Sequence, residues 1–222
     1  MKIIYKNKIF MVNIIIFGVK LIIILIRENW ITHISNLHFL IRENSMNYKS
    51  ILKDYVLPVI LAIILAFFVR KFIIFQISVP SESMYPTIKI GDRIMVTRLY
   101  DLSKLKRGDI IVFDSKELDK PLIKRLIGLP GDKVTINKGT VYINGEKLIE
   151  SYVVNNEDYS GSFDVPEGKY LFFGDNRADS FDARKWQNSY IDGEDIKGKA
   201  RFIVYPFKRF GKFITGKDAL TH

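Results

Sequence analysis

The pattern of apolar and polar positions divides the chain into two parts of different texture. Residues 56–69 form a run of 14 residues without a charge, and beyond Arg70 and Lys71 the apolar residues continue to Phe75. Such a run alone makes about 21 Å of helix, whereas the hydrocarbon core of a bilayer is ~30 Å thick. Because Arg70 and Lys71 near a helix end can extend to the interface, the pattern predicts a membrane-spanning helix over about residues 55–74. No small-residue cleavage site follows the run, which argues against a removed signal peptide.

A second apolar run covers residues 9–26 but contains Asn13 and Lys20. A lysine near a helix centre costs roughly 2.5–3.5 kcal/mol on insertion scales. Two interpretations stay open: a first transmembrane helix, or a segment outside the mature protein. Met46 opens a basic stretch of the kind that begins a chain, so residues 1–45 are an N-terminal extension that either contains a first transmembrane helix over residues 9–26 or is an upstream segment that is not native. Residues 46–75 are the cytoplasmic start and the span over about residues 55–74.

From Gln76 onward the chain consists of short β-type runs separated by Gly, Pro and Asp, and no helix of convincing length appears. Asn137-Lys138-Gly139 and Asn144-Gly145 predict hairpin turns. The pattern predicts a mainly β domain over residues 76–222, with short antiparallel strands in a barrel-like or sandwich-like arrangement. The predicted strands are 93–97, 110–113, 122–127, 133–136, 140–143, 169–173 and 200–205.

Charge supports membrane attachment. The net charge is +10; residues 1–75 hold 10 Lys+Arg and 3 Asp+Glu, and residues 76–222 hold 24 and 21. A nucleic-acid binder more often carries its basic patch on the folded domain, so we expect membrane lipid and not nucleic acid as a partner. Lys49 and Lys53 before the span favour a cytoplasmic N-terminal side and an exported domain, whereas Arg70 and Lys71 argue the other way.

Two residue types restrict the chemistry. The chain has no cysteine, which excludes disulfides, Cys-ligated zinc and thiol catalysis, and its histidines are His33, His38 and His222. A Ser–His–Asp triad is therefore excluded between residues 39 and 221. No Gly-Lys is followed by Ser or Thr, so a phosphate-binding loop is absent. We expect neither a metal nor a cofactor.

A serine and a lysine remain as candidate chemistry. Ser81 and Ser83 lie between Pro80 and Pro86, which restrict the backbone, and Lys124 lies in an apolar strand. A serine hydroxyl needs a base, and a lysine with an ordinary pKa of ~10.4 becomes one after losing about three pKa units, or ~4 kcal/mol, to desolvation. The alternative is an ordinary strand lysine beside turn-forming serines.

Four blocks, in order after the apolar run, resemble bacterial type I signal peptidases, the Ser–Lys leader peptidases. The similarity covers about residues 48–209, and the short stretch between Asp132 and Gly174 resembles the compact Gram-positive form. The blocks are residues 80–87 (PSESMYPT), 106–113 (KRGDIIVF), 123–132 (IKRLIGLPGD) and 174–184 (GDNRADSFDAR).

The resemblance implies a role for each matching residue. Ser83 corresponds to the nucleophile, Lys124 to the general base, and Ser81 to the hydroxyl that joins the Ser83 N–H in the oxyanion hole. Ser180 corresponds to the serine that orients the lysine. The residues expected to support the site are Asp182 and Arg184, as an ion pair, and Arg125. Ala183 and Gln187 depart from the usual family residues, at positions without core chemistry.

The family removes signal peptides from exported preproteins after small residues at the first and third positions before the scissile bond. This implies preproteins as partners, and a cell-membrane protein that is single-pass, or two-pass if residues 9–26 also span. The residues expected to line the shallow substrate pockets are Ile77, Val79, Ile94, Val112 and Ile123. Two rival functions are a Ser–Lys protease of the same fold with another substrate, and a membrane-tethered adaptor without activity.

Overall fold

The computed structural model describes residues 48–211 and 213, and the chain divides into two compact units between Phe68 and Val69. The described helical part consists of α2 (Tyr48–Ile51), a π-helical turn η1 (Leu52–Val56) and α3 (Leu57–Phe72). The apolar run at residues 9–26 and the extension over residues 1–45 lie outside the described residues, so both remain predictions.

One helical stretch, Leu52–Phe72, is long and apolar enough to cross a membrane, and none of it is buried within the structure. It ends two residues before the predicted boundary because the chain enters strand β1 (Ile74–Ser78) there. The Ile73 amide still donates to Val69 at 2.8 Å, but the Ile73 carbonyl already accepts from Arg98 at 2.8 Å. Pairing with the next strand thus decides where the helix stops.

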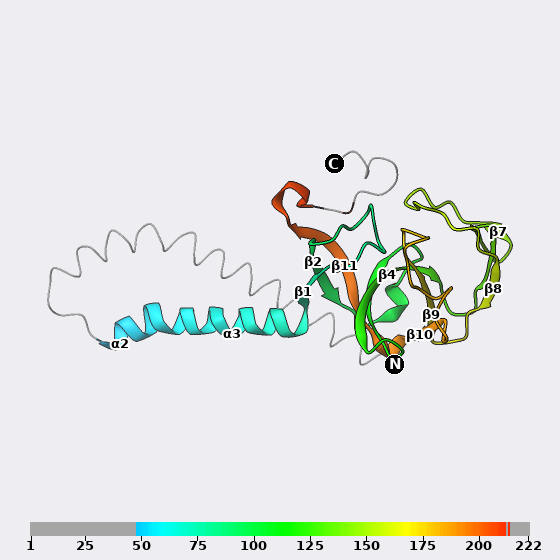
Figure 1. Cartoon of the computed structure of the whole chain (residues 1–222). Helices are drawn as coiled ribbons and strands as arrows, with labels where there is room; N and C mark the ends of the chain where they lie inside the picture. Colours follow the sequence, from blue (N-terminus) through cyan, green and yellow to red (C-terminus); the bar gives the residue numbers. More distant parts are fainter. Residues whose placement is uncertain (1–47, 212, 214–222) are drawn as a thin grey trace. The chain divides into compact units, whose positions relative to one another are not determined.

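The β part contains two antiparallel sheets and, in the residues that the structure describes, no closed barrel (Figure 1). The larger sheet has the order β1-β2-β11-β3-β4-β9-β10, and the smaller has the order β7-β6-β5-β8. After β1, the larger sheet contains β2 (Arg93–Arg98), β3 (Ile110–Ser115), β4 (Lys120–Gly128), β9 (Lys169–Phe173), β10 (Tyr190–Asp192) and β11 (Ile196–Tyr205). The smaller contains β5 (Lys133–Asn137), β6 (Thr140–Ile143), β7 (Glu146–Lys147) and β8 (Gly161–Asp164).

The predicted mainly β fold is confirmed, and each predicted strand is present. The prediction missed β1, β7, β8 and β10, which are short or lie in the presumed membrane run. β8 has the sequence GSFD and β10 has YID, neither long enough to display a period of two. Only their pairing with β5 and β9 makes them strands.

The two predicted hairpin turns form as expected. Lys138 and Gly139 have φ values of 45° and 75°, and Asn144 and Gly145 have φ values of 52° and 88°. Two consecutive positive φ angles are typical of a tight hairpin turn whose twist matches the strands that it joins. These turns fix the register of β5, β6 and β7 in the smaller sheet.

Strand β4 separates two apolar clusters. Its pairing with β3 sets Ile111 opposite Lys124 and Val112 opposite Ile123. Since directly paired residues share a face and successive residues alternate, Lys124 faces one cluster and Ile123 faces the other. The first cluster includes Ile111, Phe113, Leu126, Phe172 and Trp186. The second consists of Val79, Met84, Ile88, Ile94, Val96, Ile110, Val112, Ile123 and Ala200.

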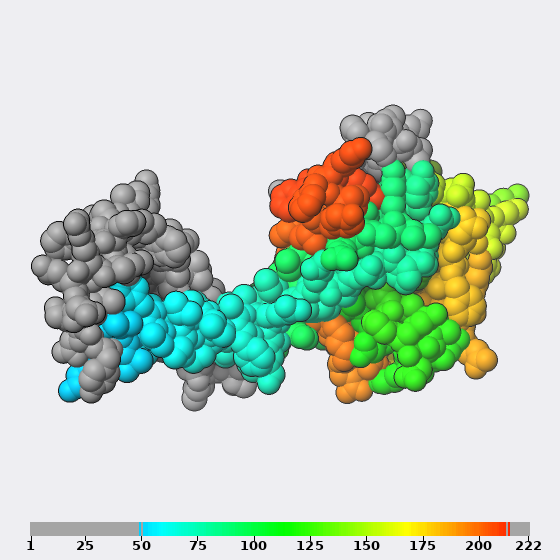
Figure 2. Space-filling view, turned by 60° about the vertical axis from the view of Figure 1, so that its left-hand side comes forward, coloured from blue at the N-terminus to red at the C-terminus, as the bar shows by residue number. Residues whose placement is uncertain are grey.

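The end of the chain returns to the beginning of the β unit. Beyond β11, Arg209 donates to the Asp92 carboxylate at 2.7 Å and to the Thr87 carbonyl at 3.2 Å. In Figure 2 the red-orange surface after β11 lies against the teal surface of the segment near residue 90. Asp92 is fully buried, so this ion pair anchors the segment that follows Ser83.

Candidate active site

Ser83 lies in the turn that joins β1 to β2. Its side chain is buried, and its hydroxyl lies 3.5 Å from that of Ser81, which is exposed. Met84 and Ile88 are fully buried in the second cluster, and the Ile88 amide donates to the Met84 carbonyl at 2.9 Å. These apolar anchors hold the turn against the sheet, so the position of Ser83 does not depend on a flexible loop.

Lys124 is a buried amine in the middle of β4, with 3% of its surface exposed. Burial lowers the pKa of Lys124 to about 8, even though the negative charge of Asp182 opposes the shift. The amine donates to the Ser180 hydroxyl at 3.0 Å. Near neutral pH the neutral fraction is therefore much larger than that of an ordinary lysine, and the neutral amine is the form that a general base requires.

Ser180, Asp182 and Arg184 form one buried group. The Arg184 guanidinium donates to both Asp182 carboxylate oxygens, at 2.8 and 2.9 Å. Burial alone would raise the pKa of Asp182, but the bonds and charge of Arg184 hold it below its usual value. The Asp182 carboxylate also accepts from the Gly174 amide at 2.8 Å, which fixes the loop that carries Ser180.

Gly174 connects the serine turn with the lysine. A Cβ at this glycine would collide with the Ser180 hydroxyl and with the Ser83 carbonyl oxygen. Gly174 therefore lies between the Ser83 backbone and Ser180, which is the hydrogen-bond partner of Lys124. Within residues 48–211, no direct hydrogen bond joins the Ser83 hydroxyl to the Lys124 amine, and bonds of this kind are often long before substrate binds.

A second ionic group, on the opposite face of β4, joins this strand to the serine turn and to the loop that begins at Gly174. Arg125 donates to both Asp175 carboxylate oxygens, at 2.7 and 2.6 Å, and to the Gly108 carbonyl at 2.8 Å. Asp175 accepts in addition from the Thr87 hydroxyl at 2.6 Å. The hydrogen bonds and charge of Asp175 raise the pKa of Arg125 against the opposing effect of burial.

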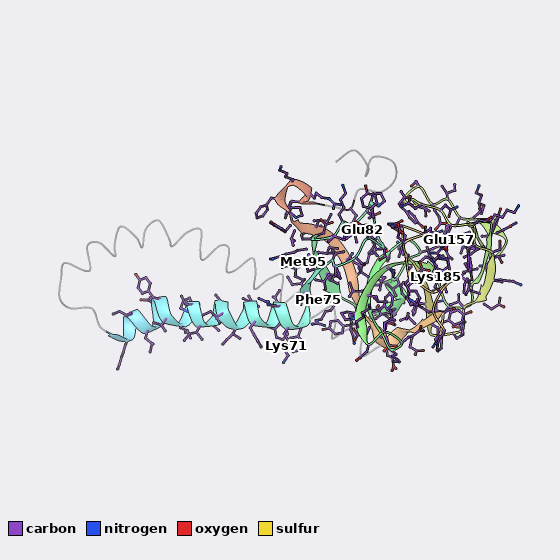
Figure 3. All side chains as sticks on the ribbon, in the orientation of Figure 1. Lys71, Phe75, Glu82, Met95, Glu157 and Lys185 are labelled. Atoms are coloured by element: carbon purple, nitrogen blue, oxygen red, sulfur yellow. The ribbon has the colours of Figure 1, made fainter. Side chains whose placement is uncertain are left out.

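The partners of this loop could not be predicted from the sequence, which connected neither Arg125 to Asp175 nor Arg177 to Glu150. The Arg177–Glu150 contact is 2.5 Å, and Glu157 lies 3.0 Å from Arg184. Glu157 also pairs with Lys185 at 3.2 Å, and Figure 3 labels this pair. No local sequence pattern predicts contacts between residues that are 27 or 50 positions apart.

The residues predicted to line the substrate pockets lie together. Ile77 packs against the second cluster, and the remaining four belong to it. Ile94 is fully buried, whereas Ile77 is half-buried and Ile123 retains 9% exposure. In this structure these side chains therefore pack against one another, and Ile77 is the one that reaches the surface most.

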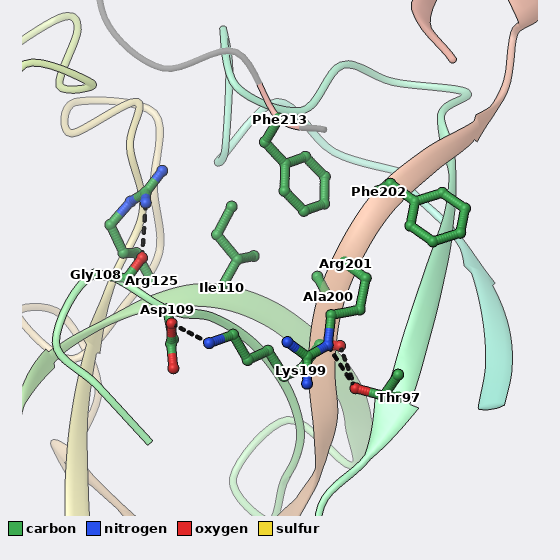
Figure 4. Close-up of a pocket in the computed structure, with 10 residues that line it drawn as sticks. All are labelled: Thr97, Gly108, Asp109, Ile110, Arg125, Lys199, Ala200, Arg201, Phe202 and Phe213. Carbon is green, nitrogen blue, oxygen red and sulfur yellow. Dashed lines mark hydrogen bonds and ion pairs between the residues drawn. The ribbon is translucent and has the colours of Figure 1, made fainter. Parts of the chain in front are cut away.

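A cavity of about 640 Å³ borders the second cluster at Ile110 and Ala200 (Figure 4). Its polar groups are already paired: Lys199 with Asp109 at 2.5 Å, and Arg201 with Thr97 at 2.7 Å. It contains neither Ser83 nor Lys124, and of the site residues only Arg125 lines it. The cavity therefore does not mark the candidate chemistry.

Among the residues that the structure describes, one acidic cluster has the spacing of metal ligands, formed by Asp192, Glu194 and Asp195. Lys116 fills it, with its amine 2.8 to 3.2 Å from all three carboxylates. These bonds raise the pKa of Lys116, so the cation of the cluster is the lysine itself. The expectation that no metal is used remains a prediction.

Residues 39–221 thus contain a buried serine and a buried lysine of lowered pKa, and no histidine. Comparisons with known proteins identify the family. The family model "Signal peptidase, peptidase S26" matches residues 52–205. The chain belongs to this family.

The relatives are similar along most of their length. Signal peptidase I of Bacillus licheniformis is 37% identical over 182 residues, covering 77% of this chain and 97% of that protein. Signal peptidase IB of Staphylococcus aureus (strain Mu50) is 36% identical over 182 residues, covering 73% and 94%. Probable signal peptidase I-2 of Synechocystis is 38% identical over 158 residues, covering 68% and 72%. The resemblance inferred from the four sequence blocks is thereby confirmed.

Proposed function

We propose that this protein is a membrane-bound serine endopeptidase that removes signal peptides from exported preproteins. Family membership supports the activity, and the relatives named signal peptidase I support the substrate class. One observation carries the mechanism. Lys124 is buried and bonded to Ser180, and Gly174 bridges Ser180 to the backbone of Ser83.

Acylation starts with the neutral Lys124 amine. It accepts the Ser83 hydroxyl proton as the Ser83 oxygen forms a bond to the scissile carbonyl carbon. The resulting ammonium then donates that proton to the leaving amine as the peptide bond breaks, which leaves an acyl-enzyme. In the second half, Lys124 accepts a proton from water, the hydroxide attacks the ester, and Ser83 recovers its proton.

The oxyanion formed in both halves needs donors. We assign the Ser83 backbone N–H and the Ser81 hydroxyl to this role, since the two serine hydroxyls lie 3.5 Å apart. Ser180 orients the Lys124 amine, and Asp182 with Arg184 holds the Ser180 loop. Arg125 supports the site through Asp175.

Substrate specificity follows from the shallow apolar surface. A preprotein in extended form would place its first and third residues before the scissile bond over Ile77, Val79, Ile94, Val112 and Ile123. Because these residues pack closely, small side chains such as alanine fit and larger ones clash.

Leu52–Phe72 supplies the anchor, and we propose a single-pass arrangement for the described residues, with residues 76–222 on the extracytoplasmic side. The chain has no cysteine, so a single introduced thiol reports its own exposure. In intact cells, an impermeant maleimide should label Ser162→Cys and spare Lys49→Cys. The reverse pattern would contradict the proposed orientation.

The direct test of activity uses the purified full chain in detergent. A peptide with Ala-x-Ala before the scissile bond should be cut after the second alanine, as mass spectrometry of the products shows. A peptide with Leu-x-Leu at the same positions is the matched control. Absence of cleavage, or equal cleavage by Ser83→Ala, would refute the proposal.

A further inference from the structure

The segment from Glu150 to Glu157, here called the crossing segment, lies across the loop that begins at Gly174. Val154 forms a parallel bridge with Asn176. The Val154 amide donates to the Asp175 carbonyl at 3.0 Å, and the Val154 carbonyl accepts from Arg177 at 3.1 Å. The crossing segment thus adds an extra strand-like contact to the loop that carries Asp175.

Tyr152 of the crossing segment covers Arg125. The centre of its ring lies 3.8 Å from the guanidinium carbon, close enough for a cation–π contact, and Arg125 is only 5% exposed. The Tyr152 hydroxyl donates to Glu150 at 2.9 Å, and Glu150 in turn accepts from Arg177. The ring is therefore held in place over the face of the guanidinium.

Arg125 is the link through which the ring can affect catalysis. Its guanidinium is held in plane by Asp175, and Asp175 accepts from Thr87, four residues after Ser83. The amide of the next loop residue, Asn176, donates to the Ser83 carbonyl at 3.1 Å. A guanidinium that tilts would shift Asp175, and with it both contacts to the serine turn.

We propose that Tyr152 is a positioning residue that keeps Arg125 in plane, and thereby aligns Ser83 with Lys124. The inference rests on the proposed peptidase function. Arg125 and Lys124 are adjacent in β4 and face opposite sides of the sheet, so Tyr152 acts on the alignment of the serine and not on the basicity of the lysine.

The experiment compares three variants of the full chain with the Ala-x-Ala peptide. Tyr152→Leu removes the aromatic face, and kcat should fall on the order of 10- to 100-fold with KM within about twofold, as for misalignment of reacting groups. Tyr152→Phe keeps the ring and should stay within about threefold of wild type. Tyr159→Leu is the matched control. Tyr159, like Tyr152, lies between β7 and β8, but it packs against the first apolar cluster.

Two measurements distinguish alignment from general loosening. The midpoint of the pH dependence of kcat should be unchanged in Tyr152→Leu. Arg125→Lys loses the planar guanidinium. In that background, Tyr152→Leu should cause no additional loss of kcat, because both changes remove the same contact between the ring and the guanidinium. If Tyr152→Leu is recovered unfolded, Tyr152→Met carries the same comparisons.

A wild-type kcat in Tyr152→Leu would overturn the inference. So would a loss as large in Tyr159→Leu, or losses that multiply in the double variant. If wild type itself does not cleave the peptide, the proposed function fails and the inference fails with it, whereas cleavage by wild type with an unchanged kcat in Tyr152→Leu overturns the role of Tyr152 alone.

Discussion

The Lys124 amine and the Ser180 hydroxyl lie 3.0 Å apart, although 56 residues separate them in the chain. Both side chains are almost completely buried. Ser180 gives the amine a polar partner without giving it a charge to pair with, so the lysine keeps a lowered pKa and still has a defined direction. This combination suits a base that must face a serine in the neutral form.

Ser83→Ala should abolish processing, with kcat reduced by roughly 10⁴-fold or more, because the nucleophilic oxygen is lost. Ser81→Ala should be milder, about 10²–10³-fold, as for loss of one oxyanion donor. Steady-state rates with the Ala-x-Ala peptide measure both, and unchanged circular dichroism controls for folding. If the two variants lose activity equally, the division of roles between the two hydroxyls is wrong.

Activity should rise with pH through a midpoint near 8, because Lys124 acts as a base only after it loses its proton. Lys124→Arg should be inactive, since a guanidinium stays protonated in proteins. Lys120→Arg, on the exposed end of the same strand, is the matched control. The measurement is kcat/KM from pH 6 to 10, and a Lys124→Arg enzyme within tenfold of wild type would end the general-base assignment.

Lys124→Met should make the protein more stable at neutral pH. The folded-state pKa of about 8 lies below the ordinary lysine value of 10.5, so the unfolded chain binds the proton more tightly. Below pH 8 the folded protein is penalised in full, by on the order of 3 kcal/mol, and the penalty disappears as the pH rises toward 10.5. Thermal unfolding of both proteins from pH 7 to 10 checks this.

The gap in Tm between Lys124→Met and wild type should therefore shrink across that range. Lys120→Met provides the comparison for loss of an exposed lysine and should show no such trend. A Lys124→Met protein that is less stable than wild type at pH 7 would contradict the desolvation argument.

Gly174→Ala should inactivate the enzyme while leaving most of the fold intact. The added methyl would collide with the Ser180 hydroxyl and the Ser83 carbonyl, so the two halves of the site must separate. A displacement near 1 Å reduces rates by about 10²-fold. In Gly193→Ala, the control, the added methyl meets chiefly the flexible end of Leu102, away from the site. Equal kcat values for the two variants would show that Gly174 does not set the spacing.

Asp175→Asn should destabilise the protein by about 3–5 kcal/mol, because it leaves the Arg125 guanidinium buried without its counter-charge. Asp114→Asn removes the partner of Lys197 from a pair that is 49% and 41% exposed, and should change stability by no more than about 1 kcal/mol. Chemical denaturation of both variants at pH 7 gives the comparison. Similar losses would mean that the Arg125–Asp175 pair behaves as a surface pair.

Much of the candidate site was predictable because its chemistry is local. The lack of histidine over residues 39–221 left lysine as the base for a serine, and the apolar strand around Lys124 indicated that its amine is desolvated. In the structure this strand does bury Lys124, with Leu126 in the first cluster and Leu122 packed against it. The apolar run before residue 75 likewise predicted the helical stretch Leu52–Phe72, which among the described residues is the one long and apolar enough to span a membrane.

The contacts that assemble the site were decided by the tertiary structure. Nothing near Arg125 in the sequence indicates Asp175, and nothing near Tyr152 indicates Arg125. These pairs meet because β3, β4 and β9 are neighbours in one sheet and the crossing segment is bonded to the loop after β9. Residue type and local periodicity determine which groups are buried and which chemistry they offer. Which group lies beside which depends on strand order and long-range packing, which no local pattern encodes.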